Sequence, residues 1–458
     1  MLICPALNGK SQSEALSQPS GALILIGSML HEQGYNVKII HMVADGVTLS
    51  GLKKIVLNFK PDVVGITVNT FQTKSTKQIS QVIKSLDNRI LIVIGGPHPS
   101  ALGTKALDDF PYVYVVVAGE GEKTMIDIVE GKSFEEIRGI CYRSDNEYIV
   151  NKPRPLSHDL DYIPLPNLDL VNLSRFYGIR PVGAYPSMYI MASRGCPFRC
   201  TFCNKSVWGS TLRVRKPNLV IEEIRWLHQK YGVNEIYFQD DTFNINRKWA
   251  VEIFQRIIDE GLNKQIVYKA AFRVDERLLD EELLKLTKEA GFWMIFYGVE
   301  SGNQGVLNGM KKGVTIREIK RAFELTHKVG LKTNASFIIG MPGESKETVV
   351  DTLNLYKEIK PDYFSFIFAI PFPNTELERI LREKGHILET NYDKYSYGKC
   401  LIRTDELTRQ NLIQLHDNIV REVVRTKIKA MQLREIIVKG VRHPKLALKI
   451  GFDILRRR

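Results

Sequence analysis

Cysteine is scarce in this sequence, and a long apolar run is absent. Six cysteines in 458 residues are too few for the disulfide framework of a secreted domain. The longest early uncharged stretch, residues 15–30, contains Ser, Gln and Pro19 and falls short of the roughly 20 apolar residues that a membrane span needs. We therefore expect neither a signal peptide nor a transmembrane helix, and a cytoplasmic location in a reducing compartment.

A dinucleotide-binding fingerprint is also missing. The first 150 residues alternate helical stretches with apolar, β-branched runs at 63–68, 90–96 and 113–122, which predicts a parallel sheet buried on both faces of a doubly wound α/β domain. Such domains bind ligands beyond the carboxyl ends of their strands, where the glycine-rich loops GGPHPS and GEGE follow two of these runs. Because Thr124 stands where the third glycine of GxGxxG belongs, we expect no nicotinamide cofactor.

Three further regions follow this domain of residues 1–150. Six prolines between 151 and 187 predict an extended linker over 151–185. From 186 to 380, short apolar strands alternate with amphipathic helices, which predicts a partial (βα)6 barrel of the TIM type. In such barrels, chemistry gathers at the carboxyl ends of the strands. Residues 381–458 are expected to form a helical region with a basic tail.

One short stretch, SRGCPFRCTFCNK, contains half of the cysteines: Cys196, Cys200 and Cys203. No fourth cysteine lies nearby, whereas a zinc ribbon needs a second pair of ligands and a ferredoxin run needs four cysteines in another spacing. A cubane iron–sulfur cluster held by three thiolates leaves one iron open, as catalytic metal sites do. The other cysteines are isolated and are expected to be small buried apolar residues: Cys4, Cys141 and Cys400.

With the aromatic Phe202 directly before the third cysteine, the CxxxCxxC motif resembles that of the radical S-adenosylmethionine (radical SAM) superfamily, over about residues 186–375. The resemblance implies a 4Fe-4S cluster whose open iron binds the amino and carboxylate groups of S-adenosylmethionine (SAM). One electron from the reduced cluster then splits a carbon–sulfur bond and yields a 5′-deoxyadenosyl radical, which takes hydrogen from an unactivated carbon. The protein positions the cofactor and shields the radical.

Further stretches resemble the SAM-binding segments of this family, each at the end of a predicted strand. GVES resembles the segment whose backbone and acid hold the methionine amino group: Gly298, Val299, Glu300 and Ser301. QDD and FRVD resemble contacts to the ribose and carboxylate, through Gln239, Asp240 and Arg273. FIIGMPGE resembles the strand along the adenine, with Ile339 and Gly340 nearest. The alternative readings are a surface ion pair for Glu300 and an ordinary strand and turn for FIIGMPGE.

A doubly wound domain directly before such a barrel resembles the cobalamin-binding half of cobalamin-dependent radical SAM enzymes. The residues that carry this resemblance are Gly95, Gly96, His98, Gly119 and Glu120. The DxHxxG motif, whose histidine ligates cobalt in many cobalamin domains, does not occur. In this subfamily the resemblance implies cobalt bound without a protein imidazole. His98 has an alternative reading as a residue that orders its loop.

The two cofactors together imply methyl transfer, in which one SAM supplies the methyl group through cobalamin and a second SAM generates the radical. A radical cyclase or carbon–carbon coupling enzyme with the same cofactors is the alternative. An alternative of another class is a non-catalytic metal-binding regulator of nucleic acid, which requires four metal thiolates and aromatic residues among the basic ones. Neither feature is visible, so we expect no nucleic acid, but a small-molecule or lipid-like substrate and a low-potential electron donor of flavodoxin or ferredoxin type.

Most of the net charge of +13 lies in the tail. Residues 425–458 contain eleven Lys and Arg but only two acidic residues, Glu435 and Asp453. Leu412, Leu415 and Ile419 follow a helical period, and the end of the chain alternates apolar with basic residues. This pattern suits a helix on an anionic membrane surface, peripheral at its inner face. The alternative is a helix that covers the barrel with its lysines in solvent.

Overall fold

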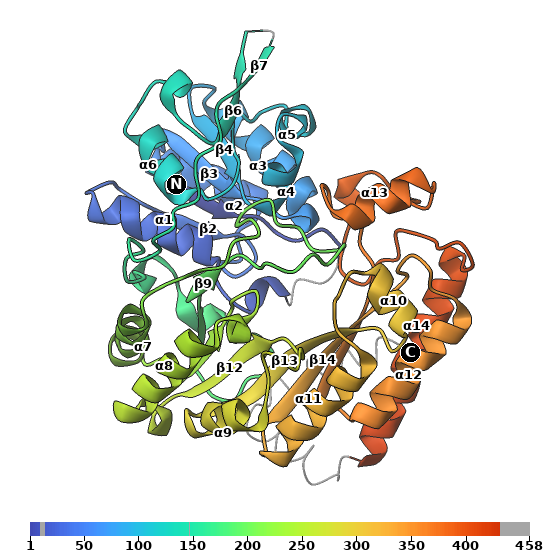
Figure 1. Ribbon diagram of the computed structural model, residues 1–458. Helices are drawn as coiled ribbons and strands as arrows, with labels where there is room; N and C mark the ends of the chain where they lie inside the picture. Colours follow the sequence, from blue (N-terminus) through green and yellow to red (C-terminus); the bar gives the residue numbers. More distant parts are fainter. Residues whose placement is uncertain (10–13, 146, 431–458) are drawn as a thin grey trace. The chain divides into compact units, whose positions relative to one another are not determined.

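The computed structural model describes residues 1–9, 14–145 and 147–430, and its first sheet has seven strands in the order β2-β1-β3-β4-β5-β6-β7. The first five strands of this order are parallel, and the last two are antiparallel. The predicted doubly wound domain is thereby confirmed (Figure 1). Its strands are β1 Leu2–Cys4, β2 Ile39–His41, β3 Val63–Thr67, β4 Leu91–Gly95, β5 Val115–Val117, β6 Ile140–Ser144 and β7 Glu147–Val150.

Helices cover both faces of this sheet, because its central strands are apolar on both sides. One face packs against α2 (Leu49–Phe59), α3 (Thr73–Leu86) and α5 (Lys105–Asp109). The other face packs against α1 (Gly21–Glu32) and α6 (Glu122–Val129). The short helix α4 (Pro97–Leu102) follows β4. The helices do not cover the carboxyl ends of the parallel strands. The loops in which the sequence predicts a ligand lie at these ends.

The second sheet has six parallel strands in chain order from β8 to β15, which confirms the partial (βα)6 barrel. Its strands are β8 Ser187–Ile190, β11 Glu235–Phe238, β12 Val267–Phe272, β13 Phe292–Glu300, β14 Lys332–Ile339 and β15 Tyr363–Phe368. Its helices are α7 Pro217–Tyr231, α8 Arg247–Asp259, α9 Glu281–Glu289, α10 Gln304–Gly309, α11 Ile316–Lys328, α12 Lys346–Ile359 and α13 Glu376–Glu383.

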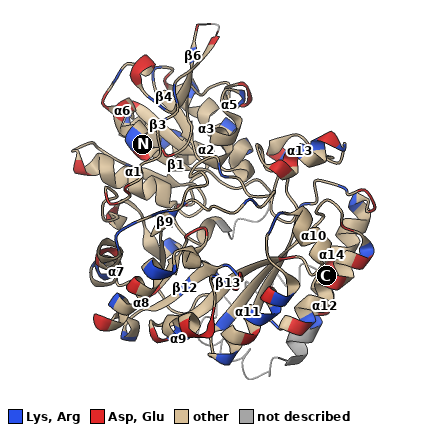
Figure 2. Ribbon diagram, viewed as in Figure 1, with Lys and Arg blue, Asp and Glu red and all other residues tan. Residues whose placement is uncertain are grey.

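Polar caps start the barrel helices directly after the loops that leave the strands. The side chain of Asp280 accepts from the backbone at the start of α9, and Thr315 and Ser345 form capping boxes for α11 and α12. Such caps satisfy backbone N–H groups that a helix leaves free. The outer face of α11 carries intermixed basic and acidic side chains (Figure 2), as expected for a solvated surface.

A buried ion pair anchors the linker to the barrel. Lys269 on β12 and Glu235 at the start of β11 are both fully buried and 2.9 Å apart. Lys269 also donates to the carbonyls of Ile179 and Pro181, and Glu235 accepts from the backbone of Gly183. The linker also contains two short 3-10 helices, η4 Leu168–Leu170 and η5 Leu173–Arg175. Because Glu235 begins its strand, this contact lies at the end of the barrel opposite the predicted chemistry.

The chain divides into two compact units, Met1–Leu407 and a second unit that begins at Thr408. Within the second unit, α14 spans Arg409–Ala430, in agreement with the helical period of Leu412, Leu415 and Ile419. None of the helices in the described part of the chain is both long and apolar enough to cross a membrane. The predicted membrane-surface helix at the end of the tail lies outside the described residues.

Candidate active site

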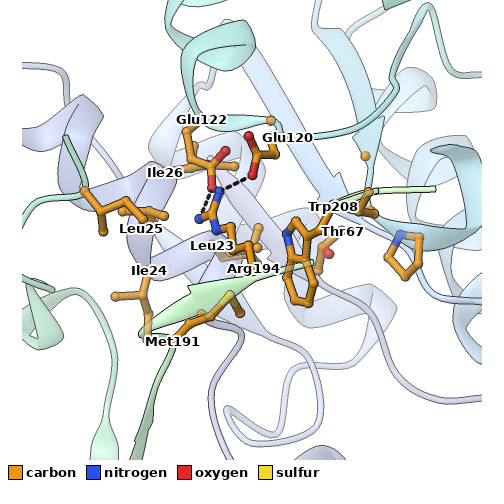
Figure 3. Close-up of a pocket in the computed structure, with 18 of the residues that line it drawn as sticks. Leu23, Ile24, Leu25, Ile26, Thr67, Glu120, Glu122, Met191, Arg194 and Trp208 are labelled. Atoms are coloured by element: carbon orange, nitrogen blue, oxygen red, sulfur yellow. Dashed lines mark hydrogen bonds and ion pairs between the residues drawn. The ribbon is translucent and has the colours of Figure 1, made fainter. Parts of the chain in front are cut away.

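A cavity of about 350 Å³ is lined by both halves of the first unit. On the side of the first sheet it is bounded by the strand-end loops that contain Gly95, Gly96 and Gly119. On the side of the barrel it is bounded by the loop that contains Cys196 and Cys203. Figure 3 shows Leu23 to Ile26 of α1, Met191 and Trp208 around the same space. The structure therefore brings the predicted cobalamin loops and the predicted cluster loop to one cavity.

The cysteine loop is closed at its base by a two-stranded antiparallel ribbon. Strand β9 (Ser193–Arg194) pairs with β10 (Arg213–Val214), and the loop between them carries all three cysteines. Lys205 closes the loop from within, because its ammonium group donates to the carbonyls of Cys196 and Phe198. The N–H of Thr201 donates to the carbonyl of Met310 at 2.9 Å, and its carbonyl accepts from Leu377 of α13 at 2.8 Å. These bonds tie the cysteine loop to segments that follow β13 and β15.

The cysteine loop fits a cluster better than a single metal ion. Cys203 is exposed, and Cys196 and Cys200 are half-buried. In the described part of the chain, no three His, Cys, Asp or Glu side chains converge closely enough to hold one ion. Three sulfur donors on a loop that opens on a cavity suit an iron–sulfur cluster with one open iron.

The other cysteines lie away from this loop. Cys141 and Cys400 are buried, as the sequence predicts for apolar structural cysteines. Cys4 at the end of β1 is partly buried, and burial raises the pKa of its thiol to about 11. None of these three thiols lines the cavity, so they are poor candidates for ligands of a group bound there.

At Gly96 a side-chain carbon would lie 3.0 Å from the backbone carbonyl of Val68, whereas the space beside Gly119 is open. Gly96 and Gly119 have φ values of 106° and 85°, a region that favours glycine. A side-chain carbon added to Gly119 would point toward the carbonyl of Val207, 3.8 Å away on the segment after the cysteines. The rest of this wall is mostly apolar, and it offers backbone and methyl groups to a large flat ligand. This cradle fits a corrin ring that is held chiefly by backbone.

Two residues of the predicted cobalamin set have other contacts. His98 is fully buried outside the cavity lining, with Nδ1 3.1 Å from the hydroxyl of Thr70 and its ring at 4.9 Å from the ring of Tyr392. This position supports the reading of His98 as a residue that orders its loop. Glu120 lines the cavity, but its carboxylate accepts from Arg194 at 2.8 Å and from Arg213 at 3.0 Å.

The predicted amino-group site of SAM contains a buried ion pair. Glu300, the last residue of β13, has a positive φ of 68° and lies 2.9 Å from the ammonium group of Lys312. Its second oxygen accepts from Ser336 at 3.4 Å. A side-chain carbon on Gly298 would lie 2.3 Å from the Glu300 carboxylate and 2.8 Å from the Lys312 ammonium group. The glycine at position 298 therefore makes space for the carboxylate of Glu300. Val299 and Ser301 are the chain neighbours of Glu300, and both are buried.

Aromatic side chains of the cysteine loop contact the cations of this region. The guanidinium of Arg273 lies 3.6 Å from the ring centre of Phe198, and Lys312 lies 5.9 Å from that of Phe202. Arg273 also donates to the backbone carbonyls of Lys312 and Gly313. The sequence did not point to Lys312, because its relation to Glu300 depends on the path of the loop after α10.

The QDD residues after β11 have three different environments. Gln239 is exposed, and Asp240 is buried and accepts from the hydroxyl of Ser193. Burial raises the pKa of Asp240 to about 7. Asp241 lines the cavity beside Cys196. Of the three residues, Asp241 is thus the one that lines the cavity, although the resemblance pointed to Gln239 and Asp240.

The FIIGMPGE segment forms the end of β14 and a tight turn. Ile339 is fully buried, and Gly340 follows with a φ of 97°. The backbone N–H groups of Gly340 and Met341 donate to the carboxylate of Glu344. Burial raises the pKa of Glu344 to about 7. This acid fixes the turn next to the strand on which the resemblance places the adenine.

Comparison with known protein families agrees with this geometry. Residues 190–356 match the model of the radical SAM superfamily, and residues 13–129 match that of the B12 binding domain. The chain is 33% identical over 402 residues to an uncharacterized methyltransferase, PH0819, of Pyrococcus horikoshii. The aligned region covers 87% of this chain and 86% of that protein. It is 29% identical to the anaerobic magnesium-protoporphyrin IX monomethyl ester cyclase of Cereibacter sphaeroides, over 86% of this chain and 65% of that protein.

Among solved structures, the fold is similar to that of the radical S-adenosylmethionine methyltransferase TsrM from Kitasatospora setae. The TM-score is 0.69 at 19% identity, over 85% of this chain and 77% of that one. The chain belongs to the cobalamin-dependent radical SAM enzymes, as the sequence predicts. Its cofactors are a 4Fe-4S cluster, SAM and cobalamin, and it is an enzyme rather than a metal-binding regulator.

Proposed function

We propose that this enzyme transfers a methyl group to an unactivated carbon of a small or lipid-like substrate. The observation that carries the proposal is the single cavity bounded by Gly95 and Gly119 on one side and by Cys196 and Cys203 on the other. A methyl carrier and a radical source that share one cavity can act on the same substrate carbon. The similarity to the methyltransferase of Pyrococcus horikoshii also supports this reaction.

Each bound group supplies one part of this chemistry: cobalamin carries the methyl group, and the cluster supplies the electron that splits SAM. The chain's own residues hold these groups and exclude water. We propose Cys196, Cys200 and Cys203 as the cluster ligands, and Gly95, Gly96 and Gly119 as the backbone cradle of the corrin. The apolar wall of α1, together with Trp208, shields a radical from solvent.

For SAM, we propose that the Glu300 carboxylate accepts from the amino group and that Gly298, Val299 and Ser301 shape its site. Arg273 and Lys312 supply the positive charge that a carboxylate requires. Phe202, Gln239 and Asp240 are proposed neighbours of the same site, and Ile339 and Gly340 are proposed backbone contacts of the adenine.

Product analysis tests the reaction. The anaerobically purified chain, reconstituted with iron, sulfide and cobalamin and supplied with SAM and a low-potential reductant, is expected to form both 5′-deoxyadenosine and S-adenosylhomocysteine. The second product reports methyl transfer from SAM, because radical cleavage gives methionine instead. Deoxyadenosine without S-adenosylhomocysteine would contradict methylation.

A radical cyclase is the second candidate, and the similarity to the cyclase of Cereibacter sphaeroides favours it. A cyclase needs the radical but transfers no methyl group, so it would give deoxyadenosine alone in the same assay. In either case we propose a flavodoxin- or ferredoxin-type protein as electron donor, because the cluster must be reduced at low potential.

We also propose that the basic tail brings the enzyme to an anionic membrane surface, which would suit a lipid-like substrate. Flotation with anionic liposomes compares the full chain with a chain that ends near Thr426. The full chain is expected to float with the liposomes and the shortened chain to stay behind. Equal flotation of the two would contradict this part of the proposal.

A further inference from the structure

The ribbon at the base of the cysteine loop brings two like charges together. Arg194 on β9 and Arg213 on β10 are direct cross-strand partners, and their side chains are only 5% and 2% exposed. Like charges directly opposite each other destabilise a strand pair, and burial increases the cost because water no longer screens them. The ribbon therefore needs negative charge from elsewhere in the fold.

The cobalamin-side loop provides this charge. Glu120 bridges the two arginines, at 2.8 Å from Arg194 and 3.0 Å from Arg213. Glu122, at the start of α6, lies 2.7 Å from Arg194. Both glutamates are 9% exposed, so the four groups form a buried cluster of two positive and two negative charges. Figure 3 shows Arg194 joined to both glutamates by dashed lines.

The cluster of four charges connects the two loops that bound the cavity. Glu120 stands between Gly119 and Gly121 of the strand-end loop, and Arg194 stands two residues before Cys196. Arg213 also donates to the carbonyls of Ser157 and Trp208, so it holds the segment after the cysteines as well. Within the described residues, the ion pairs of Arg194 and Arg213 are the ones that join the segment 193–214 to the domain of residues 1–150.

We propose that Glu120 and Glu122 are positioning residues, which fix the cluster loop relative to the cobalamin loop through Arg194 and Arg213. In this assignment Glu120 does not bind cobalamin directly. Its carboxylate forms ion pairs with both arginines, and the strand-end glycines hold the corrin. The four charges set the separation between the methyl carrier and the radical source, which any reaction that uses both must control.

Pulsed electron paramagnetic resonance measures this separation without turnover, because the reduced cluster and cob(II)alamin each carry an unpaired spin. In the reconstituted holoenzyme we expect one narrow distribution of the distance between the two spins. Two double variants each remove one positive and one negative charge: Glu120→Gln with Arg213→Gln, and Glu122→Gln with Arg194→Gln. Both are expected to keep iron and cobalamin and to broaden the distribution.

A product assay separates positioning from general damage. The double variants should keep deoxyadenosine formation, which depends on the cluster and SAM alone. Formation of S-adenosylhomocysteine should fall roughly tenfold or more, because a misplacement on the order of 1 Å can cost up to about 100-fold in rate. The spin measurement does not depend on methyl transfer, so it tests positioning even if the enzyme proves to be a cyclase.

A matched control removes a buried ion pair that lies within the barrel alone, Lys269→Met with Glu235→Gln. This control should lower the stability and leave the distance distribution narrow. If a double variant does not fold, Arg194→Lys keeps the charge but offers one donor group in place of a fork, and an intermediate broadening is expected. The proposal is overturned if the variants and the wild type have equally narrow distributions, or if only the Glu120 variant loses cobalamin.

Discussion

The carboxylate of Glu300 and the ammonium group of Lys312 form a buried ion pair of 2.9 Å at the carboxyl end of β13. The amino group of SAM carries the same charge as Lys312, and both groups suit the same carboxylate. SAM binding at this position therefore requires Lys312 to share Glu300 or to move toward the carboxylate of SAM. The pair holds the acid in place in the absence of SAM, so the acid is not left as an unpaired buried charge.

Replacing Glu300 should weaken SAM binding. Glu300→Gln is expected to raise the dissociation constant roughly tenfold to a hundredfold, because a hydrogen bond to a charged group contributes about 1.5–3 kcal/mol. Gly298→Ala should act in the same direction, since its side chain would collide with the ion pair. Isothermal titration of the cluster-loaded protein with SAM measures both. Glu347→Gln, on an acid outside this site, is the control, and an equal effect there would contradict the assignment.

Removing a cluster cysteine should abolish iron binding. Cys196→Ser and Cys203→Ser each leave two thiolates, which cannot hold a cube that already has one open iron. The iron content of the reconstituted protein should fall to background, while bound cobalamin remains. Cys400→Ser is the control, because this buried cysteine lies outside the loop. Full iron content in either loop variant would show that the cluster has another ligand.

Adding a methyl group at Gly119 should displace cobalamin. Gly119→Ala places a side chain in the cradle and strains a backbone with a φ of 85°. Gly103→Ala imposes similar strain at a φ of 58°, with no atom within 4 Å of the new carbon. Cobalamin retention, read from the absorption spectrum after gel filtration, should fall for Gly119→Ala alone. Equal losses in both variants would assign the effect to backbone strain.

Glu344 gives the apoprotein a pH dependence of stability. Burial raises its pKa to about 7, so between about pH 4.5 and pH 7 the unfolded chain releases a proton that the folded chain keeps. The free energy of unfolding therefore falls as the pH rises through this range. The loss is about 3 kcal/mol, because one pKa unit corresponds to about 1.36 kcal/mol.

Glu344→Gln removes this titration and leaves that of Asp240 in place. Denaturant unfolding at about pH 5 and about pH 8 should show that the variant gains stability relative to wild type at the higher pH. A stability difference that is the same at both pH values would contradict a raised pKa for Glu344.

Local patterns were enough to predict much of the fold. The six barrel strands are apolar segments separated by amphipathic helices, and the cysteine loop and GVES lie at strand ends as expected. Short strands were missed, since β1 has only three residues and its sequence carries no visible period. The β6–β7 hairpin was missed as well, because β7 is largely exposed and lacks an apolar face.

The contacts of the site were harder to predict, because they join distant segments. Glu120 and Arg194 are 74 residues apart, and nothing in either local sequence predicts their ion pair. The direction in which a loop side chain points was equally hard to predict from the sequence. His98 follows a glycine pair at a strand end, as a ligand contact would, but it points into the protein toward Thr70 and Tyr392.

The most direct test of the account is electron–nuclear double resonance of the reduced holoenzyme with SAM labelled with ¹⁵N in its amino group. With the three proposed cysteine ligands one iron is left open, so a hyperfine coupling is expected between the cluster and this nitrogen, in protein that also contains cobalamin. The coupling should be lost in Glu300→Gln at SAM concentrations that saturate the wild type. A saturated complex without any nitrogen coupling, with a protein side chain on the fourth iron, would contradict it.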